Sequence, residues 1–257
     1  MSTTADIDLG DLDLWRDGPP HELFAQLRRE PLHFSELADF EHERGFWSVV
    51  RYEDIAAVGR DFETFSSERS ILLVDKLSWD PEVPDPMDMA QHMLISTDPP
   101  RHDRMKALVQ RAFNARRVAE HEQRIRDIIN LVYDRALERH PDGRIDLVQD
   151  VALHVPTMVI GDMLGAPRED SERLVNWTNR TVAFEDPRLV PDLRDIFVAL
   201  EEFIPYVDGV IRARRERPTE DLTTAFIQAE IDGDQLSPEE ILLFFFLLMV
   251  AGNDSTR

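Results

Sequence analysis

Residues 241–257 read ILLFFFLLMVAGNDSTR, an unbroken run of eleven apolar residues that passes directly into a polar cluster. Just upstream, Ser237, Pro238 and Glu240 form a capping-box signature, which predicts that a helix begins here. From this point to Arg257 the stretch predicts about 20 residues of helix, roughly 30 Å at 1.5 Å per residue. Because the helix is apolar on all sides, we expect it to cross the middle of the protein core.

The polar end of this stretch carries the candidate catalytic residues. Gly252 costs a helix about 1 kcal/mol relative to alanine, and the Ser255 hydroxyl can bond the carbonyl of Ala251, four residues earlier. Together they would loosen one turn and leave room beside the backbone for a small molecule. Asp254 and Ser255 would then form a proton relay. The alternative is a helix that ends in ordinary polar residues, although an acid near a helix C-terminus opposes the macrodipole.

Composition limits the class of protein. The chain has 257 residues, 42% of them hydrophobic, with no cysteine and a net charge of −22. The lack of cysteine excludes disulfides, thiolate metal sites and a cysteine nucleophile within this chain. The acidic balance argues against nucleic acid as a partner. The N-terminus lacks a signal-peptide pattern, and the longest apolar run falls short of the roughly 20 residues of a membrane span. We therefore expect a cytoplasmic protein that binds neither nucleic acid nor membrane.

One segment departs from the acidic balance. His102 and Lys106 are four residues apart and share a helix face, where paired cations could hold a dianionic group such as two carboxylates. The alternative is a solvated basic face that covers a buried apolar stripe. Within residues 101–117, six cations stand against one anion, Asp103; the cations are Arg101, Arg104, Lys106, Arg111, Arg116 and Arg117.

The remaining pattern predicts a mainly α-helical chain with a small β portion. Long irregular loops in compact proteins are often functional, and one such loop is expected at residues 66–93. Nearly everything after residue 98 is predicted to be helical. The predicted elements are a loose leader at 1–20, a short helix after the prolines at 19–20, a hairpin between 32–37 and 45–50, a short helix at 51–61, a turn with a short extended piece at 141–148, and a buried helix at 149–165 kinked at Pro156.

Two segments taken together resemble the cytochrome P450 family in its bacterial soluble form. They are STDPPRHDRMKALVQRAFNARRV at 96–118 and AGNDSTR at 251–257. In that family, the pattern D-P-P-x-H-x-x-x-R supplies a histidine and an arginine to the haem propionates. His102 matches the histidine, and Lys106 replaces the arginine, which keeps the charge but loses the bidentate fork.

The second segment is similar to the family pattern A-G-x-D/E-T-T, which crosses the oxygen-binding face of the haem. Ser255 occupies the place of the family's oxygen-activating threonine, so a hydroxyl is retained with less restraint at χ1. The residues that match the pattern are Ala251, Gly252, Asp254, Ser255 and Thr256.

The resemblance implies a fold and a function. The fold would be the N-terminal part of the P450 fold, with residues 21–257 as the N-terminal portion of one domain. The function would be haem-dependent monooxygenation of a small apolar molecule, with electrons from a ferredoxin-type protein near residues 101–117. His102, Lys106, Ala251 and Gly252 would contact the haem, and Asp254 and Ser255 would deliver protons. Candidates for the substrate pocket, each of which could equally be a core residue, are Ile71, Leu72, Leu73, Phe184, Leu247 and Val250.

The family's chain extends beyond this helix, to a loop whose cysteine thiolate binds the haem iron. Because this chain contains no cysteine, we expect an incomplete fold truncated within the central helix, and no activity from the chain alone. A truncated gene, a partial gene prediction or a deliberately shortened chain would all give this sequence. The alternative functions are a non-catalytic remnant that binds partners and an unrelated acidic helical interaction module.

Overall fold

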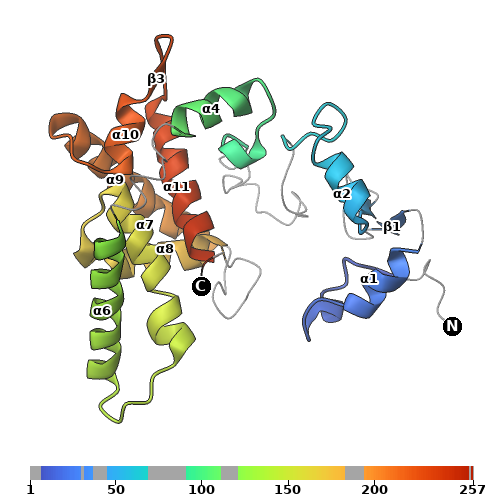
Figure 1. The fold of residues 1–257 in the computed structure, drawn as a ribbon, viewed down its shortest axis with the longest axis horizontal. Helices are drawn as coiled ribbons and strands as arrows, with labels where there is room; N and C mark the ends of the chain where they lie inside the picture. The colour runs from blue at the N-terminus through green and yellow to red at the C-terminus, as the bar shows by residue number, and fades with distance from the viewer. Residues whose placement is uncertain are drawn as a thin grey trace. The chain divides into compact units, whose positions relative to one another are not determined.

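The structure is a computed structural model that describes residues 7–29, 32–36, 45–68, 91–110, 121–182, 194–254 and 256 (Figure 1). The chain forms two compact units. The first consists of residues 1–91 and 95–99, and the second of residues 92–94 and 100–257. The 3₁₀ turn η4 (Leu94–Ser96) lies where the sequence passes from one unit to the other.

The first unit contains the predicted hairpin. Strands β1 (His33–Glu36) and β2 (Gly45–Ser48) pair antiparallel, with His33 opposite Ser48 and Glu36 opposite Gly45. Aromatic rings of the two strands also meet across the pair, since the ring centroids of Phe34 and Trp47 are 5.0 Å apart. The two predicted short helices are also present, as α1 (His21–Leu27) and α2 (Tyr52–Val58).

Residues 7–20, predicted as a loose leader, make defined contacts with this unit. Leu9 is buried, and its backbone N–H donates a hydrogen bond to the Ser35 hydroxyl at 3.3 Å. The ring of Trp15 lies 5.8 Å from that of Phe24 in α1. These contacts join the described part of the N-terminal segment to the hairpin and α1. The segment also contains the 3₁₀ turn η2 (Leu12–Trp15).

The second unit is helical, with one small hairpin. Its helices bury one large apolar cluster, to which α4 and α7 to α11 all contribute. In chain order the elements are α4 (Arg101–Gln110), α6 (Glu122–Arg139), the π-helical segment η5 (Leu147–Ala152), α7 (Val155–Leu164), the 3₁₀ turn η6 (Arg168–Asp170), α8 (Ser171–Val182), α9 (Arg194–Glu216), α10 (Leu222–Gln228), β3 (Glu230–Ile231), β4 (Asp234–Gln235) and α11 (Pro238–Asp254).

Helix α11 is the central element of this unit, as its apolar sequence predicts. It packs against α7, α8, α9 and α10, and Figure 1 shows it running beside α7. The predicted capping box is present, because the Glu240 N–H donates to Ser237 Oγ at 3.1 Å and the Ser237 N–H donates to Glu240 Oε2 at 2.8 Å. Ile241, Phe245 and Met249 are buried. The helix has 17 residues and ends at Asp254.

The prediction of a helix kinked at Pro156 is wrong. Residues 147–152 form a π-helical segment, and α7 begins separately at Val155, so that Pro156 occupies its first turn. Proline lacks an N–H and fits the first turn of a helix, where that N–H would have no helical partner. The extended piece predicted at 141–148 is also wrong in part, because Leu147 and Val148 belong to the π-helical segment.

The hairpin of β3 and β4 was not predicted from the sequence. Its turn residues Asp232 and Gly233 have φ angles of 54° and 84°. Positive φ at both central residues is characteristic of the type I′ turns that join two strands tightly, and Asp-Gly is a preferred pair for them. The strands have two residues each, which is too short for an alternating pattern to be visible.

By length and composition, one described stretch could cross a membrane, namely Leu147–Leu164. It comprises η5 and α7, and α7 packs against α6, α8 and α11. Thr157, Met158, Gly161 and Leu164 are buried within the unit. Core helices often meet this criterion, so the stretch is weak evidence for a membrane span.

Candidate functional site

Helix α4 presents the predicted pair of cations on one flank. His102 and Lys106 are one turn apart, with Lys106 exposed and 30% of the His102 side chain exposed. His102 Nδ1 lies 3.1 Å from Asp103 Oδ1. The helix is anchored next to this flank by Met105 and Leu108, which are fully buried. The two residues therefore occupy neighbouring positions on one flank of α4.

Arg104, which the sequence analysis treated only as one of several cations, lies on the other flank of α4. Its guanidinium contacts Asp234 in β4 and Glu240 in the first turn of α11. The hydrogen bond to Asp234 raises the pKa of the guanidinium and lowers the pKa of the Asp234 carboxyl. Asp234 and Glu240 lie 130 and 136 residues after Arg104 in the chain, so no local sequence pattern could have revealed these contacts.

Four of the predicted site residues of α11 occupy one face of the helix. Leu247, Val250, Ala251 and Asp254 follow the i, i+3, i+4, i+7 spacing of a single helical face. Ala251 is exposed, and Leu247 and Val250 are half-buried. The backbone of Asp254 is the last helical position. The structure therefore brings these positions together on one side of α11.

Gly252 lies on a different side of the helix, against α7. A Cβ atom at this position would lie 2.5 Å from Cγ1 and 2.8 Å from Cδ1 of Ile160. The prediction that Gly252 leaves room for a small molecule is therefore wrong on this side, because Ile160 fills the space. The glycine instead permits close approach of the two helices.

Several predicted site residues lie outside the described part of the chain. Ser255 is one of them, and the structure describes the backbone but not the side chain of Asp254. Four candidates for the substrate pocket also lie outside it, namely Ile71, Leu72, Leu73 and Phe184. Their roles remain predictions.

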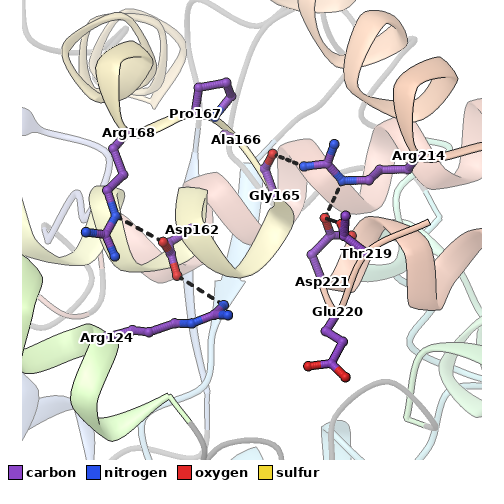
Figure 2. Close-up of a pocket in the computed structure, with 10 residues that line it drawn as sticks. All are labelled: Arg124, Asp162, Gly165, Ala166, Pro167, Arg168, Arg214, Thr219, Glu220 and Asp221. Carbon is purple, nitrogen blue, oxygen red and sulfur yellow. Dashed lines mark hydrogen bonds and ion pairs between the residues drawn. The ribbon is translucent and has the colours of Figure 1, made fainter. Parts of the chain in front are cut away.

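A polar cleft of about 400 Å³ lies elsewhere in the second unit (Figure 2). On one side, Asp162 at the end of α7 lies between two cations, Arg168 at 3.3 Å and Arg124 of α6 at 3.7 Å. On the other side, Arg214 of α9 donates to Asp221 and, at 2.5 Å, to the carbonyl of Gly165.

These interactions explain the cleft in structural terms. Gly165 has a φ of 81°, and a Cβ there would collide with the carboxylate of Asp221. Asp221 also caps α10 by accepting the Thr224 N–H at 2.8 Å. The charged groups thus bind α7, α9 and α10 to one another. The predicted site residues lie on α4 and α11 instead.

Comparison with known proteins finds similar sequences among bacterial monooxygenases. The chain is 36% identical over 265 residues to a methyl-branched lipid omega-hydroxylase of Mycobacterium tuberculosis, covering 98% of this chain and 59% of that protein. It is 31% identical to a steroid C26-monooxygenase of Rhodococcus jostii, covering 97% of this chain and 52% of that protein. No model of a known protein family matches the chain. The chain thus spans a little over half the length of these curated relatives.

Solved structures show the same similarity in three dimensions. The Mycobacterium marinum cytochrome P450 CYP268A2, solved in complex with pseudoionone, superimposes with a TM-score of 0.82 at 31% identity, covering 100% of this chain and 62% of that one. Cytochrome P450 CYP109Q5 from Chondromyces apiculatus gives a TM-score of 0.76, also at 31% identity, and covers 98% of this chain and 58% of that one. The sequence similarity and the shared fold, mainly α with a small β portion, show that this chain belongs to the bacterial cytochrome P450 family.

Proposed function

We propose that this chain forms part of a haem-dependent monooxygenase that hydroxylates a small apolar molecule. The observation that supports this most strongly is the 36% identity to a lipid hydroxylase across 98% of the chain. Relatives are named for reactions on methyl-branched lipids, a steroid and linalool, and a related structure holds pseudoionone. Because the chain spans only part of these relatives, the activity is proposed for a protein that contains this chain.

The described residues fit a haem at its propionates. Two propionates form the dianionic group that the exposed Lys106 ammonium and the neighbouring His102 can bind. With Nδ1–H donating to Asp103, Nε2 can donate to a propionate carboxylate only in the doubly protonated imidazole, which is the form that this proposal requires. When bound, the haem supplies the chemistry that activates oxygen. Its axial thiolate does not come from this chain, which contains no cysteine.

Helix α11 would supply the proton path and one wall of the substrate site. We assign the Asp254 carboxyl and the Ser255 hydroxyl to proton transfer, as an acid and a hydroxyl at the end of the helix. Ala251 would face the haem, while Leu247, one turn earlier, and Val250, the preceding residue, would contact the substrate. Gly252 would act by holding α11 against Ile160 of α7. Ile71, Leu72, Leu73 and Phe184 remain candidates for contact with the substrate.

Electrons would come from a separate acidic protein of the ferredoxin type. The exposed cation Arg101 of α4 supports this proposal, because opposite charge speeds the encounter of two proteins. Arg104 contributes less, since Asp234 and Glu240 neutralise it. We place the protein in the cytoplasm, where such redox partners are available.

Haem titration tests the propionate site. The Lys106→Ala substitution should weaken haem binding roughly tenfold, because charge-assisted hydrogen bonds contribute about 1.5–3 kcal/mol and each 1.4 kcal/mol is a factor of ten. The matched control is Arg126→Ala, which removes an exposed cation of α6 that pairs with Glu122 at 2.9 Å. Equal haem affinity of the two variants would contradict the assignment.

The proton path is tested in a longer protein that contains this chain and a cysteine ligand. Ser255→Ala should lower the product formed per reductant consumed, while Ser255→Thr should preserve it because the hydroxyl remains. Asp254→Asn should slow turnover, by a factor on the order of 10² to 10⁴ if the acid contributes as general acids usually do. An unchanged ratio of product to reductant in Ser255→Ala would remove Ser255 from the path.

A further inference from the structure

We infer that Arg104 is a positioning residue, which fixes α4 to the start of α11 and thereby places His102 and Lys106 for binding the haem. The inference deepens the proposed function and rests on it for the role of the two cations. The contacts of Arg104 itself are independent of that proposal.

Arg104 joins three elements through one side chain. Its Nε donates to Asp234 Oδ2 at 2.5 Å, and one terminal nitrogen donates to Asp234 Oδ1 and to the Gln235 carbonyl, both at 2.9 Å. The other terminal nitrogen donates to Glu240 Oε1 at 2.7 Å. This use of both sides of the planar guanidinium fixes its orientation, which a lysine ammonium cannot reproduce.

Glu240 connects this contact to the first turn of α11. Its Oε1 accepts from Arg104, and its Oε2 accepts from the Ser237 N–H in the capping box. Only 14% of the Glu240 side chain is exposed, so water screens the ion pair little. The helix that carries the proposed proton path therefore holds α4 through a residue of its first turn.

Arg104 and Lys106 lie on opposite flanks of α4. Two residues apart on a helix, they are separated by roughly 200° about its axis. Met105 and Leu108, which are fully buried, lie on the face between them. α4 has ten residues, and a rotation about these buried side chains would displace the flank with His102 and Lys106. The ion pairs of Arg104 oppose this rotation.

Loss of Arg104 would also leave two acids facing each other. Asp234 and Glu240 both contact the same guanidinium, so its removal brings repulsion between the carboxylates as well as the loss of attraction. The hairpin and the start of α11 should then separate from α4. Loss of Arg104 would weaken haem binding indirectly, by displacing α4, because Arg104 itself lies on the flank away from Lys106.

The first experiment measures helix position without haem. Because the chain has no cysteine, spin labels can be attached at two introduced cysteines, Gln110→Cys on α4 and Gln228→Cys on α10, both exposed. Arg104→Gln should broaden the distance distribution between the labels. Glu240→Gln should broaden it less, since glutamine preserves the capping box but loses the ion pair. Arg126→Gln on α6 is the matched control and should leave the distribution unchanged.

The second experiment measures haem affinity in a double-mutant cycle. Arg104→Gln should weaken haem binding roughly tenfold. Lys106→Ala should cost about tenfold in the unsubstituted chain but about threefold or less in the Arg104→Gln background, because the displaced lysine contributes less. Arg104→Lys, which keeps the charge without the fork, should fall between the unsubstituted chain and Arg104→Gln.

The outcomes separate this inference from the proposed function. If Arg104→Gln and Glu240→Gln leave the label distances as they are in Arg126→Gln, Arg104 does not position α4. Additive effects of Arg104→Gln and Lys106→Ala on haem affinity would also overturn the inference. If a longer protein that contains this chain and a cysteine ligand binds no haem, the proposed haem site is wrong, and the label distances alone then decide whether Arg104 holds α4.

Discussion

At Gly252, a hydrogen in place of a side chain lets α11 pack against Ile160 of α7. A Cβ there would lie 2.5 Å from Cγ1 of Ile160, well inside normal contact distance. Isoleucine is β-branched and stiff at χ1, so it cannot turn aside cheaply. Helix propensity and packing thus act in opposite directions at this position, since alanine is the better helix former by about 1 kcal/mol.

We therefore expect the effect of Gly252→Ala to depend on residue 160. In the unsubstituted chain it should lower the free energy of unfolding by about 1 kcal/mol, because overpacking typically costs about 1–3 kcal/mol and propensity recovers part of it. In an Ile160→Ala background the same substitution should raise the free energy of unfolding, by up to about 1 kcal/mol. Urea denaturation measures both values. The same sign in both backgrounds would show that Ile160 is not the constraint.

Asp150 is a buried acid whose charge is held by its neighbours. Its carboxylate accepts the Asp146 N–H at 2.8 Å and lies 3.1 Å from His140 Nε2. The backbone hydrogen bond is the largest cause that lowers the pKa of Asp150, and the contact with His140 lowers it further, against the opposing effect of burial. Asp150 thereby joins the end of α6 to the π-helical segment that precedes α7.

The lowered pKa of Asp150 predicts how stability depends on pH. A carboxyl with a folded-state pKa below the unfolded value of about 3.9 stabilises the fold above that value, and this contribution is lost as the pH falls through the folded pKa. Asp150→Asn should therefore melt at a lower temperature than the unsubstituted chain at pH 7, with the gap narrowing below about pH 4. Asp134→Asn, at an exposed position of α6, is the control and should show little change. A gap that stays constant with pH would contradict the assignment.

Among the elements, α11 shows most clearly how a local pattern specifies a structure. The order Ser237, Pro238, Glu240 predicts a capping box, and both of its hydrogen bonds are present. Ser237→Ala should lower the free energy of unfolding by about 0.5–2 kcal/mol, as replacement of an N-cap serine usually does. Ser237→Asn should retain most of the stability, since asparagine also caps well. Equal unfolding midpoints of the serine and alanine chains in urea would show that the cap contributes nothing.

The elements that could be predicted are those specified by neighbouring residues. The antiparallel pairing of β1 with β2, the start of α1 after two prolines and the shared flank of His102 and Lys106 all follow from local spacing. Those that were missed depend on context. Pro156 fits either a kink or a first turn, and the choice depends on whether the preceding turn is α-helical or, as here, π-helical.

Contacts between segments that are distant in the sequence explain the other features that were not predicted. Nothing near Arg104 in the sequence indicates Asp234 or Glu240, which join it only when β4 and the start of α11 pack beside α4. Likewise, a glycine in an apolar helix indicates either open space or close packing, and only the position of Ile160 decides between them. Tertiary packing, which local spacing does not specify, settled both cases.

At the scale of the whole molecule, the fold matches a family whose haem ligand is a cysteine, and the composition contains no cysteine. The chain matches cytochrome P450 structures over its full length, with a TM-score of 0.82 to one of them. Yet the family binds its haem iron through a cysteine thiolate, and these 257 residues contain eight histidines, eight methionines and no cysteine. The family's axial thiolate is therefore not among these 257 residues.

The carbon monoxide spectrum of the haem-loaded chain should show whether a thiolate ligates the iron. Haem added to the 257-residue chain can be ligated by histidine or methionine, both of which are known axial ligands, but not by a thiolate from the chain. After reduction and addition of carbon monoxide, we expect the Soret band of a histidine-ligated or unligated haem, with a cysteine-containing cytochrome P450 as the reference for the thiolate band. His102→Gln should weaken haem binding without changing the band, because His102 is assigned to a propionate rather than to the iron. A change in the band with His102→Gln would show that this histidine ligates the iron, and the proposed orientation of the haem against α4 would then be wrong.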